Sequence, residues 1–240
     1  MTEPKLEQAR EWLNGAKSLA VLTGAGISAE SGIPTFRGAG GLWKEYKPEE
    51  LATPEAFARD PRLVWEWYNW RRELIKKAQP NAAHRALVKL EIRIANFTLI
   101  TQNVDGLHDM AGSGKILKLH GDIWRMRCTA CGANWPDRRA PLPKLPPHCA
   151  CGGLARPGVV WFGEPLPEGM MKEAEHAASS AQVFLVIGTS ATVFPAASLA
   201  PYAKQGGARV IEINTEPSAV SKVDCVLTGP AGEMLPKLLG

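Results

Sequence analysis

Six short apolar segments, separated by helical stretches, limit what this 240-residue chain can fold into more than any other feature. Strands buried on both faces of a sheet read as continuous apolar runs, and alternation with helices is typical of parallel sheets. The pattern therefore predicts an α/β fold with a Rossmann-like, doubly wound parallel sheet. The expected strands lie at residues 19–22, 97–101, 116–119, 183–187, 209–213 and 223–227.

Polar clusters follow five of these segments, at residues 24–26, 102–105, 120–122, 188–190 and 214–216. In open parallel sheets, ligands bind beyond the carboxyl ends of the strands. Each cluster alone would be an ordinary loop, but all five are expected at the same edge of the sheet. The sequence therefore predicts one ligand site at that edge.

The first cluster begins the pattern Gly24-x-Gly26-x-x-Ala29. Such glycines let a backbone approach a pyrophosphate at a helix N-terminus, where unpaired N–H groups and the helix dipole favour anions. A tight turn is the alternative interpretation. A glycine-rich segment, residues 38–43, follows where an ordinary dinucleotide site would lead to a second strand. We expect it to fold over a bound nucleotide, with Arg37 facing phosphate or ribose.

Four of the five cysteines form two close pairs, Cys128 with Cys131 and Cys149 with Cys151. This spacing suits one tetrahedral Zn²⁺ with a structural role, because four thiolates leave no open position. Free buried cysteines are one alternative. A second is that His148 replaces a cysteine, since only one residue separates the second pair. We expect all four cysteines to bind the ion.

The cysteine-rich stretch also divides the chain. We expect residues 123–157 to form a small zinc-binding module, inserted into a main domain made of residues 1–122 and 158–240. Asn81 is predicted to be the N-cap of a helix.

Composition excludes several classes of protein. The apolar fraction of 45% is that of a globular protein, and the net charge of +4 is too small to indicate nucleic acid binding. No apolar stretch has the length of a membrane span, and the N-terminus does not resemble a signal peptide. Clustered cysteines suit a reducing compartment. We expect a cytoplasmic monomer without membrane or stable nucleic acid partners.

His120 is the strongest candidate for catalysis among the histidines, because it ends a strand at the predicted ligand edge. A pKa near neutrality suits a general base. The alternative is a loop histidine without a catalytic role. We expect His84, His148 and His176 on the surface, and His108 in a turn.

The residues from Val21 to Trp43 resemble the NAD-binding signature of the sirtuin family. The clusters at 102–105, 119–121, 188–190 and 214–216 match the family in the same order, as does the four-cysteine module. The resemblance implies a protein-lysine deacylase that uses NAD. In that reaction the acyl oxygen of an acylated lysine attacks C1′ of the NAD ribose, nicotinamide leaves, and the acyl group moves to ADP-ribose. His120 would take a proton from a ribose hydroxyl.

The resemblance also implies roles for individual residues. Asn103 and Asp105 would line the nicotinamide pocket, Ser190 and Asn214 would hold ribose and adenine, and Ala231 would lie under the adenine. The implied cofactor-binding residues are Gly24, Ala25, Gly26, Ala29, Glu30, Thr35, Phe36, Arg37, Trp43, Gln102, Asn103, Val104, Asp105, Gly188, Thr189, Ser190, Asn214, Thr215, Glu216 and Ala231. The implied substrate residues are Ala52, Tyr68, Arg71, Val160, Phe162, Gly163 and Glu164, of which those at 160–164 would pair with the peptide as an added strand.

Tyr68 and Arg71 lie three residues apart on a predicted helix, so they share one face. A hydroxyl and a guanidinium together suit a carboxylate. With the flanking residues 51–54, this helix resembles the bacterial sirtuin subclass that removes succinyl and malonyl groups, and Ala52 would leave space for the longer chain. Residues 38–80 would then form a helical insertion holding the cofactor loop and the acyl pocket. The alternative is a Trp-rich helix on which the two side chains only stack.

Three other functions compete with this reading. A hydride-transferring dehydrogenase would need an acid after the second strand, where the chain has Gln102 and Asn103. A zinc knuckle that grips nucleic acid would use its basic residues, but the module lacks a basic recognition helix. ADP-ribosyl transfer to protein shares the cleavage of NAD and stays open.

Overall fold

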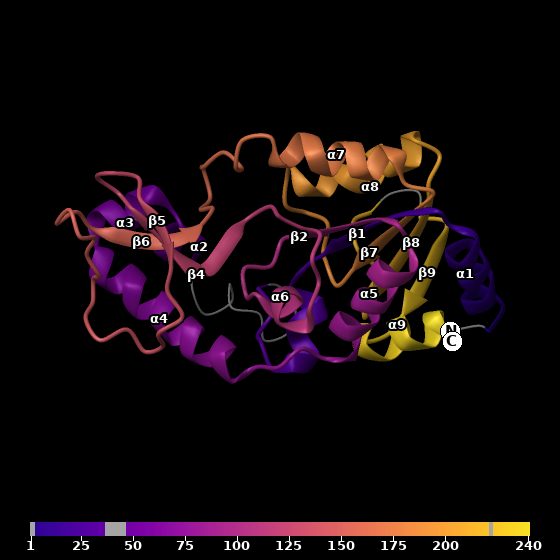
Figure 1. Ribbon diagram of the computed structural model, residues 1–240, viewed down its shortest axis with the longest axis horizontal. Helices are drawn as coiled ribbons and strands as arrows, with labels where there is room; N and C mark the ends of the chain where they lie inside the picture. The colour runs from indigo at the N-terminus through magenta and orange to yellow at the C-terminus, as the bar shows by residue number, and fades with distance from the viewer. Residues whose placement is uncertain (1–2, 37–46, 221–222) are drawn as a thin grey trace.

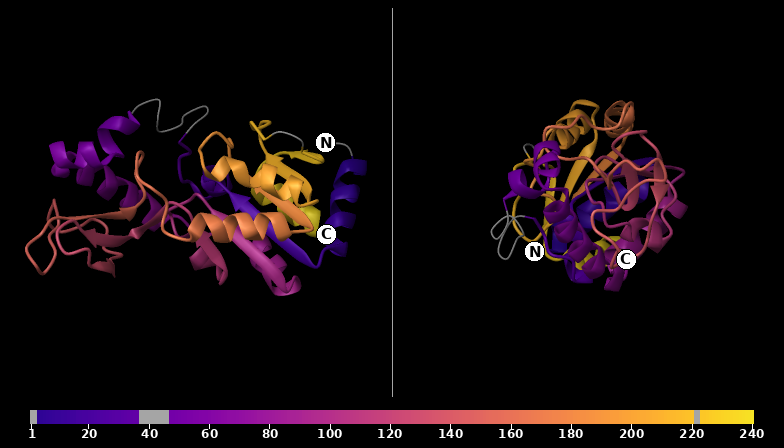
Figure 2. Two further views of the ribbon diagram at one scale, coloured as in Figure 1. Left: turned by 90° about the horizontal axis from the view of Figure 1, so that it is seen from above. Right: turned by 90° about the vertical axis from the view of Figure 1, so that its left-hand side faces the viewer.

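The computed structural model describes residues 3–36, 47–220 and 223–240. Figure 1 shows a larger α/β unit and, at the other end of the molecule, a smaller unit that holds α2 (Pro48–Leu51), α3 (Pro54–Arg59), α4 (Pro61–Lys77) and a small sheet. The view from above in Figure 2 shows the same elongated arrangement, with the smaller unit at one end. Within the described part of the chain, no helix combines the length and the apolar character needed to cross a membrane.

The larger unit is built on a six-stranded sheet with the order β3-β2-β1-β7-β8-β9, in which every neighbouring pair is parallel. The predicted Rossmann-like class is confirmed. The chain winds outward in opposite directions from β1 and β7, so the switch point lies between them. The strands are β1 Ser18–Thr23, β2 Asn96–Thr101, β3 Ile116–Lys118, β7 Val183–Ile187, β8 Arg209–Asn214 and β9 Cys225–Thr228.

Helices cover both faces of this sheet. Successive strand residues point to opposite faces, so neighbouring residues of one strand belong to different cores. Leu19 and Val21 belong to a core with α1 (Glu3–Gly15), α5 (Ala82–Arg93) and α9 (Ala231–Leu239). Ala20 and Leu22 belong to a second core, with α7 (Met170–Ser180) and α8 (Leu199–Gln205). Burial on both faces is the physical reason for the continuous apolar runs. The remaining short elements of this unit are η1 Ala25–Ser31, α6 Leu107–Ala111 and η3 Ala196–Ser198.

Helix α5 begins at the predicted N-cap. The Asn81 side chain accepts hydrogen bonds from the backbone N–H groups of Ala83 and His84. The His84 ring turns back toward Asn81 and completes a capping box. The prediction that His84 lies on the surface is therefore wrong, since this return places its ring in the core with 0% exposure. His148 and His176 are exposed, as expected. His108, expected in a turn, lies in α6 and is buried, so that prediction is also wrong.

The smaller unit contains an antiparallel sheet that sequence analysis did not predict. Its order is β5-β4-β6, with bounds Gly121–Cys128 for β4, Asn134–Pro136 for β5 and Ala155–Val159 for β6. Helices α2 (Pro48–Leu51), α3 (Pro54–Arg59) and α4 (Pro61–Lys77) pack against it in one shared hydrophobic core. The zinc-module residues and the described part of the helical insertion, residues 47–80, thus share one core.

Polar contacts also join α4 to this sheet. The Trp65 indole donates to the Ala155 carbonyl at 2.7 Å, and the Asn69 side chain accepts from the Leu142 backbone N–H at 2.7 Å. Arg72 is fully buried, donates to the Asp137 backbone carbonyl and pairs with the Asp137 carboxylate at 3.5 Å. Because a buried cation without its partner is costly, this pair holds α4 firmly in place.

Candidate active site

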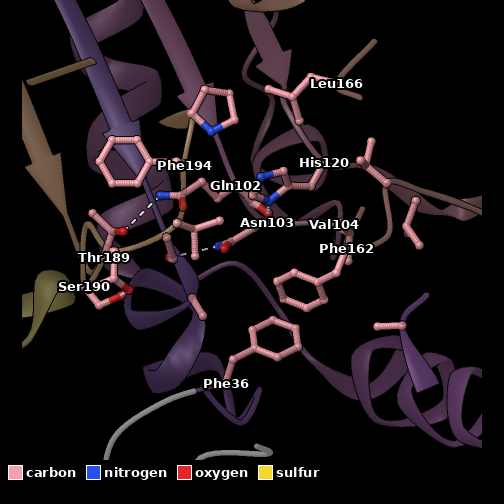
Figure 3. Close-up of a pocket in the computed structure, with 18 of the residues that line it drawn as sticks. Phe36, Gln102, Asn103, Val104, His120, Phe162, Leu166, Thr189, Ser190 and Phe194 are labelled. Carbon is pink, nitrogen blue, oxygen red and sulfur yellow. Dashed lines mark hydrogen bonds between the residues drawn. The ribbon is translucent and has the colours of Figure 1, made fainter. Parts of the chain in front are cut away.

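A cavity of about 1140 Å³ runs along the carboxyl ends of the strands and into the smaller unit. Figure 3 shows His120 and Asn103 near its middle, with Thr189 and Ser190 toward one side and Phe162 toward the other. Small-molecule sites usually measure about 300–1,000 Å³. The cavity therefore has room for a dinucleotide together with part of a second substrate.

The glycines after β1 serve close packing between two loops at the switch point. A Cβ at Gly26 would lie 2.7 Å from the Gly188 Cα, and one at Gly24 would lie 2.7 Å from the Thr189 Cβ. The Gly24 and Gly26 N–H groups donate to the carbonyls of Ile187 and Gly188. The expectation that these N–H groups are unpaired at a helix N-terminus is wrong. Both N–H groups are already hydrogen-bonded within the protein, and the chain continues as the 3-10 helix η1.

Amide side chains connect these loops across the floor of the cavity. Asn103 donates to the Gly24 carbonyl at 3.1 Å and to the Ser28 hydroxyl at 3.2 Å. Gln102 donates to the Thr189 hydroxyl at 2.9 Å. Because each amide is fixed by a partner, the remaining polar atoms are held in set directions toward the cavity.

Asp105 lies behind this floor, and its carboxylate accepts from the Ser28 hydroxyl at 2.8 Å and from the Leu107 backbone N–H at 2.8 Å. Burial raises the pKa of this carboxyl, while these two hydrogen bonds and the charge of Arg71 oppose that shift. Asp105 therefore reaches the cavity only through Ser28, which in turn holds Asn103.

His120 lines the cavity with a defined ring orientation. Its Nδ1 lies 3.0 Å from the Gln102 backbone carbonyl, which can only accept, so Nδ1 carries the hydrogen. Nε2 is then the nitrogen that can accept a proton. Burial lowers the pKa of His120, and the hydrogen bond to Gln102 opposes this only in part. The ring is consequently neutral near pH 7, as a general base must be. The neighbouring Gly121 is required by its φ of +80° and by close approach of the Gly158 carbonyl, not by the ring.

The end of the cavity in the smaller unit carries a buried guanidinium among aromatic rings. The Arg71 Cζ lies 4.8 Å from the Phe36 ring centroid, 4.9 Å from Trp67 and 5.9 Å from Tyr68. Burial lowers the pKa of Arg71, opposed by attraction from Tyr68 and Asp105. Within the described residues, the guanidinium has no carboxylate at ion-pair distance. Burial raises the pKa of Tyr68, so its hydroxyl stays protonated and can donate.

Residues 160–164, which were predicted to pair with the substrate peptide, follow the end of β6 and border the same cavity. The Val160 N–H donates to the His120 carbonyl at 2.9 Å, and the Phe162 N–H donates to the Ala52 carbonyl at 2.9 Å. The segment is thereby fixed between His120 and Ala52, the residue that follows α2.

The four clustered cysteines meet in space. Their Sγ atoms all lie within 4.8 Å of one another. A tetrahedral site with Zn–S bonds of about 2.3 Å has Sγ atoms roughly 3.8 Å apart, and the Cys128–Cys151 and Cys131–Cys149 pairs lie at 3.5 and 3.8 Å. The residues therefore fit one zinc ion with no open position. His148 is outside this group, and its Nδ1 lies 3.1 Å from the Pro146 carbonyl.

Most of the residues predicted for the site line the cavity. Ala29, Glu30, Asp105 and Ala231 do not: Ala29 is exposed, Glu30 accepts from the Gly232 N–H, and Ala231 is the first residue of α9, buried in the core. Arg37 and Trp43 lie outside the described residues. The predicted residues that line the cavity are Gly24, Ala25, Gly26, Thr35, Phe36, Ala52, Tyr68, Arg71, Gln102, Asn103, Val104, His120, Val160, Phe162, Gly163, Glu164, Gly188, Thr189, Ser190, Asn214, Thr215 and Glu216.

Several cavity residues were missed by sequence analysis, among them Leu166 and Phe194. Phe194 is 76% exposed at the rim and belongs to the loop that continues the cluster after β7. Extending each polar cluster to the next helix would have found it. Trp161 lies within the predicted segment 160–164 and lines the cavity, but it was given no role of its own, because an aromatic residue inside an apolar run predicts core.

The fold and the cavity together define a nucleotide-dependent enzyme of the doubly wound α/β class. The sequence matches the family model described as "Sir2 family" over residues 24–195. It is 58% identical over 207 residues to an NAD-dependent protein deacylase of Aquifex aeolicus, covering 86% of this chain and 87% of the relative. It is 56% identical over 229 residues to NAD-dependent protein deacylase 2 of Pyrobaculum aerophilum, covering 95% and 92%. The chain belongs to the Sir2 family, the sirtuins.

Solved structures give the same result. A crystal structure of a Sir2 homologue in complex with NAD superposes with a TM-score of 0.90 at 50% identity, covering 97% of this chain and 92% of that one. A Sir2 protein with a deacetylated p53 peptide and 3′-O-acetyl ADP-ribose superposes with a TM-score of 0.84 at 30% identity, covering 98% and 97%.

Proposed function

We propose that this sirtuin is an NAD-dependent protein-lysine deacylase that removes succinyl and malonyl groups in preference to acetyl groups. The general activity follows from membership of the family, whose curated relatives above are NAD-dependent protein deacylases. NAD is the cosubstrate and zinc the structural ion. Acylated lysine peptides are the substrate class, in keeping with the p53 peptide in the solved relative.

The residues of the cavity suit this reaction. NAD supplies an activated ribose, whose C1′ accepts the acyl oxygen as nicotinamide departs. Gln102 and Asn103 supply fixed dipoles instead of a strong nucleophile, which suits a site where positive charge develops. His120 takes the proton from a ribose hydroxyl at Nε2, since its Nδ1–H is committed to Gln102.

One observation carries the acyl preference: Arg71 is 7% exposed, lines the cavity and has no carboxylate at ion-pair distance in the described residues. Stacking on three rings offsets part of the cost of burying this charge. A substrate carboxylate would supply the missing counter-ion and a bidentate partner. The small Ala52 side chain leaves space in the same cavity for the longer acyl chain.

Replacement of Arg71 by Met tests this preference. R71M should lower kcat/KM for a succinyl-lysine peptide by about 10²-fold, the effect of removing a charged hydrogen-bonding partner worth roughly 3 kcal/mol. The value of kcat/KM for the same peptide carrying acetyl-lysine should fall far less. Products are measured by mass spectrometry with NAD, which also detects ADP-ribosylated peptide. Lys77→Met removes an exposed positive charge from the same helix and serves as the matched control. Equal losses on both substrates would refute the acidic-acyl preference.

A further inference from the structure

Trp161 connects the segment that borders the peptide side of the cavity to the acyl end. Its indole Nε1–H donates to the Tyr68 hydroxyl oxygen at 2.9 Å, across 93 residues of sequence. The Trp161 side chain is 3% exposed and also lines the cavity. Both partners are buried, so this bond is not exchanged with water.

The bond from Trp161 limits what the Tyr68 hydroxyl can do. A tyrosine hydroxyl has one hydrogen to donate and can also accept. Trp161 is a donor only, so it occupies an accepting position on the oxygen and leaves the Tyr68 hydrogen available. Among the described residues that hydrogen has no acceptor, and Arg71 lies beside the same ring. The donor of Tyr68 and the charge of Arg71 can therefore meet one carboxylate.

Trp161 is itself held rigidly. The Arg156 Cζ lies 3.4 Å from the indole centroid, and the Phe57 ring lies 5.3 Å from it. The Trp161 backbone N–H donates to the Glu164 carboxylate at 2.8 Å, and Glu164 pairs with Arg156 at 2.5 Å. With its ring and backbone both fixed, the indole N–H has one direction, which is the direction of Tyr68.

We infer that Trp161 is a positioning residue for acyl selection, which directs the Tyr68 hydroxyl toward the carboxylate of a succinyl or malonyl group. This inference rests on the proposed function and assigns part of its specificity to a residue outside the Tyr68–Arg71 pair. It also predicts where the effect falls. Tyr68 lies at the distal acyl carboxylate and not at the reacting carbonyl, so the change should be in KM for the acidic substrate more than in kcat.

Trp161→Phe keeps an aromatic ring and removes the donor. Matched succinyl-lysine and acetyl-lysine peptides are compared by their ratio of kcat/KM values. W161F should lower the succinyl-to-acetyl ratio by about five- to tenfold, the usual effect of losing one buried hydrogen bond. In a Tyr68→Phe background, W161F should leave the ratio unchanged, because the acceptor is already gone.

Trp12→Phe is the control, since it also changes an indole to a phenyl ring, but at a residue that packs against the core of the larger unit and does not line the cavity. It should change both substrates alike. If W161F folds poorly, site-specific incorporation of 3-benzothienylalanine at position 161 removes the N–H with little change of shape.

The outcomes separate the two proposals. If R71M lowers the ratio and W161F does not, the positioning role is overturned while the acidic-acyl function stands. If R71M also leaves the ratio unchanged, the proposed function itself fails. A lower ratio for W161F that persists in full in the Tyr68→Phe background would overturn the route through Tyr68.

Discussion

Two histidines with buried side chains predict that the protein loses stability in mild acid. The His84 and His108 rings pack with centroids 4.8 Å apart, and the side chains are 0% and 2% exposed. The His108 Nε2 lies 3.1 Å from the Thr23 hydroxyl. Nδ1 of His108 and Nε2 of His84 have no partner within the described structure. In the doubly protonated form, each ring would therefore hold one buried N–H without an acceptor.

Burial accordingly lowers the pKa of His84 to about 4, with further lowering by the charge of Arg85. Burial lowers the pKa of His108 to about 3, with further lowering by the charges of His84 and Lys118. In the unfolded chain both have a pKa near 6.5. The unfolded state thus binds protons that the folded state does not. Stability is fully present above pH 6.5 and falls as the pH drops from 6.5 toward these lower values.

Each pH unit in this window removes about 1.4 kcal/mol for each histidine. Between pH 6.5 and pH 5 each histidine should therefore remove about 2 kcal/mol, and the pair about 4 kcal/mol, of the free energy of unfolding. This is a large part of the roughly 5–15 kcal/mol that holds a typical protein folded.

Urea unfolding followed by tryptophan fluorescence at pH 7, 6 and 5 measures this effect, with excess zinc to keep the cysteine site loaded. His84→Asn and His108→Asn each replace a titrating ring by a neutral amide, so each should flatten the pH dependence by about 1.4 kcal/mol per unit. His176→Asn, at an exposed position on α7, should not change it. If the slopes of the wild type and both variants coincide, the histidines are not buried as neutral rings and the reasoning is refuted.

Two further predictions concern the site and its support. His120→Ala should lower kcat/KM by about 10²–10⁴-fold. Because the pKa of His120 is lowered, the wild-type rate should fall only as the pH drops below the usual pKa of a histidine. An unchanged rate in the variant would exclude His120 as the base. Cys131→Ser should release zinc, measured with a chromogenic chelator, and lower the melting temperature by about 10 °C, as expected for a loss of several kcal/mol. Retention of both zinc and melting temperature would contradict the four-cysteine site.

The sequence by itself determined the features that depend on local order. The six strands of the large sheet were predicted because burial on both faces requires continuous apolar runs. The Asn81 cap depends on residues three positions apart, and the cysteine pairs on residues two and three apart. The prediction that the polar clusters meet at one edge of the sheet required only that the strands are parallel.

The tertiary structure decided the contacts between distant residues. In the sheet of β4, β5 and β6, the short strands β5 and β6 were missed because each contains Pro. β4 does alternate between apolar and basic residues over 124–128, a signal that the sequence analysis did not use. His84 was misplaced because helical spacing does not reveal which face another helix will cover. The bond of Trp161 to Tyr68 and the pair of Arg72 with Asp137 join segments more than 60 residues apart. Such contacts form only when distant segments pack together, so the periodicity of one segment does not predict which residue of another segment it contacts.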